Sequence, residues 1–166
     1  MPSYRDARCK YCGFTYLGLL IFIALIALAS TTAVSVGTLV QRRSAEEELL
    51  FIGGQFRSAF QSYATITPAG QPQFPNQLED LVQDPRFPKP VRHLRKIFVD
   101  PITGKPDWHL IPAPAGGIMG ISSASDTAPI KIGNFSDADL ALEGKEKYSE
   151  WVFYYSPGYL TGATKR

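Results

Sequence analysis

The chain has 166 residues, with 17 lysines and arginines against 15 aspartates and glutamates, and a formal net charge of +2 at pH 7. A charge this near to zero excludes the strongly basic composition typical of nucleic-acid-binding proteins, and we expect no nucleic-acid partner. The two cysteines, Cys9 and Cys12, both lie near the start of the chain. They lack the two further ligands of a zinc site and the folded surroundings of a redox motif, so we expect no metal, no cofactor and no disulfide supporting the fold.

A long apolar segment follows a short basic leader, residues 1–13. The segment runs from Phe14 to Val40 without a charged side chain. As a helix rising ~1.5 Å per residue it would be roughly 40 Å long, enough to cross a bilayer core of about 30 Å. Because the leader is basic, the positive-inside rule places it in the cytoplasm and the bulk of the chain across the membrane. We therefore expect a single-pass membrane protein with residues 14–40 in the lipid bilayer.

Three interpretations of this N-terminus compete. An ordinary secretory signal would be cut after Ala29, but such a signal has no need of the uncharged extension to Val40. A permanent signal anchor explains the length but not the glycine at position 13. A leader removed ahead of the apolar segment explains both features, because a glycine lets a protease approach the backbone closely. We favour this third interpretation, in which the membrane helix becomes the mature N-terminus.

The junction Gly13-Phe14-Thr15, with its basic leader and long apolar helix, resembles the class III signal of type IV pilins and type II secretion pseudopilins. The resemblance implies cleavage between Gly13 and Phe14 by a prepilin peptidase, followed by methylation of Phe14. It also implies assembly with other pseudopilins by an inner-membrane platform protein and its ATPase. The family usually has a glutamate five residues after the cut, where this chain has Gly18. That departure implies an atypical or minor subunit, such as one at a fibre tip.

The helix is expected to continue beyond the membrane as a periplasmic segment, residues 41–66. Apolar side chains recur there at steps of three and four, which places them on one stripe of a helix. Thr67 and Pro68 end the pattern. We expect the stripe to be core against a globular domain, residues 67–166, and also consider it as packing between fibre stalks. The stripe consists of Leu49, Ile52, Phe56, Phe60 and Tyr63.

Two glycines, Gly53 and Gly54, interrupt this helical pattern. Together they cost about 2 kcal/mol of helix stability relative to alanine. They indicate either a flexible point or a close helix contact.

The remaining residues predict an α+β domain. Asn76 and Glu79 have the spacing of a helix N-cap with a capping box, and residues 91–99 suggest a helical turn leading into a short strand. Residues 107–111 and 118–122 predict a hairpin, and residues 151–155 have the composition of a further strand. The expected fold is pilin-like, a long N-terminal helix packed against a small antiparallel sheet. Several of these segments also resemble small bacterial proteins related to the major pseudopilin.

No enzyme chemistry is expected from the remaining motifs. Ser125 and Asp126 could join His93 or His109 in a triad, but the serine lacks the strand-to-helix turn of a nucleophile elbow. The major pseudopilin has a calcium loop, for which this chain offers carboxylates without EF-hand spacing, and we do not transfer that site. Those carboxylates are Asp126, Asp137, Asp139 and Glu143.

A basic cluster is the other candidate surface. We expect it to be a solvated face and not a binding patch. Its members are Lys89, Arg92, Arg95 and Lys96.

Two alternatives to a fibre subunit stay open. One is a membrane-anchored periplasmic binding module that does not polymerise. The other, weaker alternative is an exported periplasmic hydrolase released after Ala29.

Overall fold

The computed structural model describes the backbone of residues 12–156 and the side chains of residues 16–27 and 38–156. The chain divides into two units, residues 1–41 and 42–166. Most of the predicted leader lies outside the described residues. So do the side chains of Phe14 and of residues 28–37 within the predicted membrane segment.

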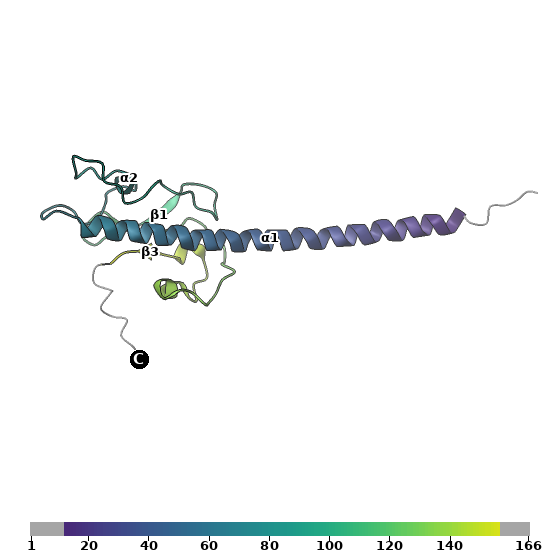
Figure 1. Ribbon diagram of the computed structural model, residues 1–166. Coiled ribbons are helices and arrows are strands. Elements are labelled where there is room, and N and C mark those ends of the chain that lie inside the picture. Colours follow the sequence, from purple (N-terminus) through teal and green to yellow (C-terminus); the bar gives the residue numbers. More distant parts are fainter. Residues whose placement is uncertain (1–11, 157–166) are drawn as a thin grey trace, which may run out of the picture. The chain divides into compact units, whose positions relative to one another are not determined.

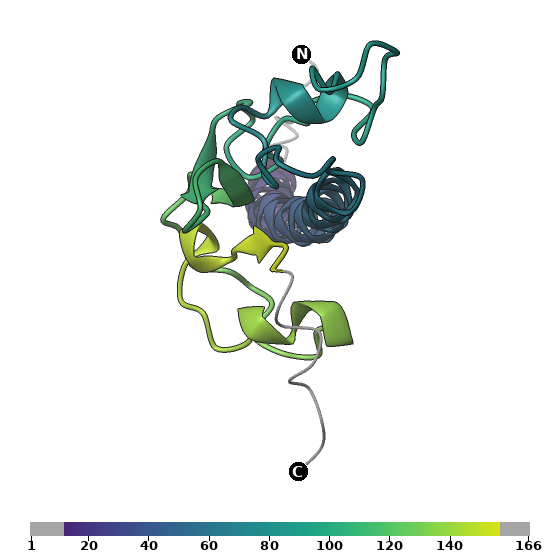
Figure 2. The same ribbon diagram turned by 90° about the vertical axis from the view of Figure 1, so that its left-hand side faces the viewer.

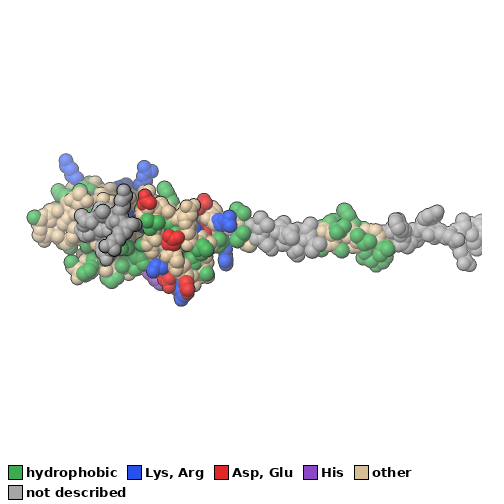
Figure 3. Space-filling model, turned by 90° about the horizontal axis from the view of Figure 1, so that it is seen from below, with side chains coloured by type: hydrophobic (Ala, Val, Ile, Leu, Met, Phe, Trp, Pro, Cys, Tyr) green, Lys and Arg blue, Asp and Glu red, His purple; other side chains and the backbone are tan. Residues whose placement is uncertain are grey.

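The helix α1, Cys12–Thr65, contributes to both units (Figure 1). Its bounds agree closely with the helix expected over residues 14–66, because the pattern that predicts it is local. Every described side chain of the first unit is exposed, including large apolar ones from Tyr16 to Ile26 (Figure 3). In the part of the chain whose residues are described, no helix combines the length and the apolar character that crossing a membrane requires.

The second unit holds a three-stranded antiparallel sheet in the order β1-β2-β3. β1, Trp108–Pro112, pairs with β2, Ile118–Ser123, across a tight reversal, as the hairpin prediction anticipated. β3, Phe153–Tyr154, pairs with the centre of β2. Figure 2 looks along α1 and shows these strands and their loops in an arc beside its C-terminal part. The α+β class is thereby confirmed.

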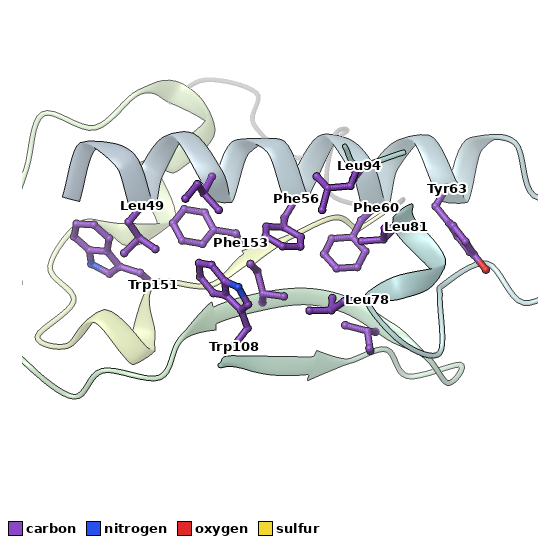
Figure 4. Close-up of a cluster of buried hydrophobic side chains, with 14 of the residues drawn as sticks. Leu49, Phe56, Phe60, Tyr63, Leu78, Leu81, Leu94, Trp108, Trp151 and Phe153 are labelled. Carbon is purple, nitrogen blue, oxygen red and sulfur yellow. The ribbon is translucent and has the colours of Figure 1, made fainter. Parts of the chain in front are cut away.

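One aromatic core fills the space between α1 and the sheet (Figure 4). Phe56 is fully buried, and its ring centroid lies 5.6 Å from that of Trp108 and 6.3 Å from that of Phe98. Burying a side chain of this size stabilises a fold by roughly 1.5–3 kcal/mol. The preferred interpretation of the apolar stripe, as core against the domain, is confirmed. The stripe residues Leu49, Ile52, Phe56, Phe60 and Tyr63 are all at most 2 % exposed.

Two expected strands are not formed as predicted. The strand expected over residues 151–155 has only two paired residues, because Trp151 closes the short 3₁₀ helix η2, Tyr148–Glu150, by donating its N–H to Tyr148 O at 3.0 Å. Trp151 is fully buried, so its apolar character reflects core packing and not strand pairing. Residues 91–99 form no strand or helix, because the N–H groups of His93 and Leu94 both bond Leu81 O instead of a neighbouring strand.

The short helix α2, Glu79–Val82, begins later than the cap prediction placed it. Asn76 is not its N-cap. The carboxylate of Asp80 instead accepts the N–H groups of Asn76 and Gln77, at 3.1 and 3.3 Å. Asp80 therefore ties the turn that precedes α2. A second 3₁₀ helix, η1, covers Asp137–Leu142 in the long connection between β2 and β3.

Candidate functional site

The predicted processing junction lies at the start of α1. The backbone of Gly13 and Phe14 is helical, and the side chain of Phe14 lies outside the described residues. At Gly18, an added Cβ would meet no atom within 4 Å. The space at Gly18 therefore accepts a larger side chain, so steric crowding does not explain why a glycine occupies the position.

Glu46 is a buried anchor that the sequence pattern did not reveal. It is the first of three consecutive glutamates, a pattern that predicts a solvent-exposed helical turn. Glu46 is nevertheless only 3 % exposed. Its Oε1 accepts the N–H groups of Ile130 and Lys131 and the hydroxyl of Tyr148, the last at 2.8 Å. Burial, together with this hydrogen bond, raises the pKa of Tyr148. Glu46 thus joins α1 to segments more than eighty residues away.

A second buried cluster closes the C-terminal end of α1. Arg86 donates to both oxygens of Asp84, at 2.9 Å from Nε to Oδ1 and 2.6 Å from Nη2 to Oδ2. It also donates to Tyr63 O at 3.1 Å and to Thr67 Oγ1 at 2.7 Å, and its guanidinium lies 3.5 Å from the centre of the Tyr63 ring. The last turn of α1 has no basic residue of its own. Arg86 therefore supplies the positive charge that a helix C-terminus favours.

The same cluster contains a serine, a histidine and an aspartate in a row. His93 Nδ1 lies 2.9 Å from Ser62 Oγ, and His93 Nε2 donates to Asp84 Oδ2 at 3.2 Å. In a hydrolytic triad, the carboxylate must be able to stabilise a charged imidazole. Here the charge of Asp84 is already paired with Arg86, so we interpret the row as structural.

Ser125 and Asp126, which the sequence offers for a catalytic triad, bond to side chains other than a histidine. Ser125 Oγ lies 2.8 Å from Thr127 Oγ1, and Asp126 accepts from Ser149 Oγ at 2.7 Å. His93 belongs to the cluster at the end of α1, and His109 is exposed on β1.

The carboxylates weighed for a calcium loop are also held separately. Asp139 pairs with Arg57 at 2.9 Å and accepts from Ser136 Oγ at 2.7 Å, whereas Asp126 lies 3.9 Å from Lys147 Nζ. Among the side chains that the structure describes, no three histidine, cysteine, aspartate or glutamate residues gather in a way that could hold a metal ion.

The basic cluster is largely exposed. The loop that follows α2 contains all four residues, Lys89, Arg92, Arg95 and Lys96. Arg92 and Arg95 border a hollow of about 550 Å³ with Gln55 of α1, and Arg95 and Lys96 border a second hollow of about 570 Å³ with Phe51. Arg92, Arg95 and Lys96 therefore line a concave surface beside the helix, whereas Lys89 borders neither hollow.

Comparison of the chain with protein-family models, with curated proteins and with solved structures gave no match.

Proposed function

We propose that this chain is a pseudopilin-like subunit of a type II secretion or type IV pilus-like fibre, and that it acts as a structural component and not as an enzyme. In this proposal it is inserted in the inner membrane through residues 14–40, with its C-terminal domain in the periplasm. A prepilin peptidase cuts after Gly13, and Phe14 is then methylated. The assembly platform and its ATPase bring the processed chain together with other pseudopilins.

One observation carries the proposal: the uncharged segment from Phe14 to Val40 begins directly after Gly13 and a basic leader. A peptidase that cuts at this point leaves the apolar helix on the mature chain. The fold is compatible with this role, because the helix that begins at Cys12 also contributes its stripe to the core of an α+β domain. Such a domain would project from the membrane on its own helix.

The N-terminus of the native protein tests the proposal directly. Mass spectrometry of the protein purified from membranes should find a chain that begins at N-methylated Phe14. The variant Gly13→Ala should keep its leader, because a methyl group at this position hinders access of the peptidase to the backbone. Gly18→Ala is the matched control, since an added Cβ there meets nothing within 4 Å, and it should be processed normally. A native chain beginning at Ser30, or an unchanged mature mass for Gly13→Ala, would contradict the proposal.

The non-polymerising anchored module is a second candidate, and Gly18 is the observation that favours it. A glutamate at this position would present a carboxylate in lipid, which is costly unless it is paired with a neighbour. This chain offers no such carboxylate at position 18. Cross-linking in intact membranes, followed by gel electrophoresis, separates the two candidates. A series of cross-linked multimers that contain the processed chain supports a fibre subunit. A processed chain that stays monomeric supports the anchored module.

A further inference from the structure

Phe51 is an aromatic side chain on the outer face of α1. It is 64 % exposed, whereas its neighbours Leu49 and Ile52 are at most 2 % exposed. A single exposed aromatic residue carries little meaning by itself. Phe51, however, borders the hollow of about 570 Å³, whose other walls are Gln55, Arg95, Lys96 and Phe98. Its ring therefore forms one edge of a concavity large enough for a bulky side chain.

The two hollows beside α1 are adjacent, because Gln55, Arg95 and Phe98 border both. We call this surface the basic groove. It consists of Phe51, Gln55, Arg92, Arg95, Lys96 and Phe98.

The cations of the basic groove have no acidic partner within the described part of the chain. No carboxylate there lies within 4.0 Å of a nitrogen of Arg92, Arg95 or Lys96, although Arg57, Arg86 and Lys147 each have one. Lys96 Nζ instead lies 5.3 Å from the centre of the Phe98 ring. Three positive charges that lack a described carboxylate partner, around a hollow with both polar and aromatic walls, attract an anionic ligand.

The floor of the basic groove is fixed by the core. Leu94, between Arg92 and Arg95, is buried and donates its N–H to Leu81 O at 2.8 Å. Phe98 O accepts the indole N–H of Trp108 at 2.8 Å, and the Phe98 ring packs edge-on against Phe56. A ligand therefore meets a loop that is already ordered, which lowers the entropic cost of binding.

We propose that the basic groove binds an acidic polypeptide segment with one bulky apolar side chain, supplied by another protein. The apolar side chain enters the hollow beside Phe51, and the carboxylates on either side of it pair with Arg92, Arg95 and Lys96. Arginine and aromatic residues of this kind commonly dominate the affinity of protein interfaces. The inference goes beyond the proposed function and does not depend on processing or on fibre assembly.

The charge around the basic groove favours a short peptide over a nucleic-acid strand. Glu47 and Glu48 are exposed on α1 one turn before Phe51. A nucleic acid carries a phosphate at every nucleotide and would place some of them near these two carboxylates. An acidic peptide can avoid this repulsion, because its chain can end, or carry an uncharged residue, next to Glu47 and Glu48.

Binding of a synthetic peptide to the full-length chain in nonionic detergent tests the proposal. The probe is a fluorescent peptide of about ten residues with glutamates on both sides of a single phenylalanine. Two matched peptides replace the glutamates by glutamine or the phenylalanine by serine. We expect saturable binding of the first peptide by fluorescence anisotropy, at least about tenfold weaker binding of each matched peptide, and weaker binding as salt rises from about 50 mM to about 300 mM.

Variants of the protein locate the binding surface. Arg95→Glu and Phe51→Ala should each weaken binding at least about tenfold. Both side chains are exposed, so these variants should keep the unfolding temperature of the original chain. Lys145→Glu reverses an exposed cation outside the groove and should bind the peptide as the original chain does.

Three results would overturn the inference. The first is equal binding of the glutamate and glutamine peptides. The second is equal or tighter binding of a single-stranded DNA oligonucleotide that is also lost in Arg95→Glu. The third is absence of peptide binding together with a self-association that Arg95→Glu abolishes, which would assign the groove to a second copy of this chain.

Discussion

Gly53 allows α1 to pack directly against Phe153 of β3. A Cβ built at this position would overlap the ring of Phe153, whereas a Cβ at Gly54 would meet nothing within 4 Å. The ring of Phe153 is fully buried, so it cannot move aside without disturbing the core. The two adjacent glycines therefore have different reasons to be in the helix.

We expect Gly53→Ala to destabilise the protein by about 1–3 kcal/mol, because overpacking forces the ring and the helix apart. Gly54→Ala is the matched control and should be neutral or up to about 1 kcal/mol more stable, since alanine is the better helix former. Urea unfolding followed by the fluorescence of Trp108 and Trp151 measures both, because the two indoles are buried. Equal effects of the two substitutions would show that the glycines act only through helix propensity.

The sequence shows that two glycines are unusual inside a helical pattern, but it does not show which of them is required by packing. The helical pattern around them is local, whereas the reason for Gly53 is a ring a hundred residues later in the chain. Glu46 is missed for the same reason, since its partners Ile130 and Tyr148 are not visible from helix periodicity. Residues that depend on distant partners are those that a single sequence leaves open.

At the scale of elements, α1 is well predicted and the segments around it less so. The stripe and the end of the helix just before Thr67 follow from spacing and turn chemistry, which act within a few residues. Its aromatic side chain predicts that Trp151 lies in a strand, but the ring is buried by packing on Tyr148 and Phe135. The basic cluster is visible in the sequence, but the hollow beside Phe51 depends on Arg95, Lys96 and Phe98 lying next to α1 in the folded chain.

The cluster at the end of α1 predicts how stability depends on acid. Burial alone would raise the pKa of Asp84, but hydrogen bonds from Arg86 and His93 outweigh it and hold the pKa below its ordinary value of 3.8. A carboxyl whose pKa is lower in the folded state stabilises the fold above its unfolded pKa, near 3.9, and loses that contribution as pH falls through the folded value. Part of the acid sensitivity of the protein below about pH 4 should therefore come from Asp84.

Asp84→Asn tests this assignment. At pH 7 the variant should be roughly 3 kcal/mol less stable, because the buried guanidinium of Arg86 loses its counter-charge. Below about pH 4 its free energy of unfolding should fall less steeply than that of the original chain, so the two curves converge. Urea unfolding between about pH 7 and pH 2 measures both effects, and Asp107→Asn, at an exposed carboxylate, is the control. Parallel curves over the whole range would show that Asp84 has no part in acid unfolding.

At the scale of the whole molecule, all described tertiary packing of large side chains belongs to the second unit. The core cluster runs from Leu49 to Phe153, and the side chain of Glu46 bonds to Tyr148, a distant segment of the same unit. The described side chains of the first unit are exposed, many of them apolar. If residues 14–40 insert in a membrane as we propose, membrane insertion depends on the first unit, whereas the packing that stabilises the fold lies in the second.

We therefore expect a chain that begins at Gln41 to fold without the first forty residues. It should unfold cooperatively, with a free energy within about 1 kcal/mol of that of the full chain in detergent, because every residue of the described core cluster lies in the second unit. Near-ultraviolet circular dichroism and urea unfolding measure this, with Phe56→Ala in the shortened chain as a destabilised control that should lose about 3–5 kcal/mol. A shortened chain with native helix content but no cooperative transition would mean that the first unit is needed to order the core. If the shortened chain folds, Gly13→Ala should change processing and leave the stability of the domain unaltered, because every residue of the described core cluster lies in the second unit.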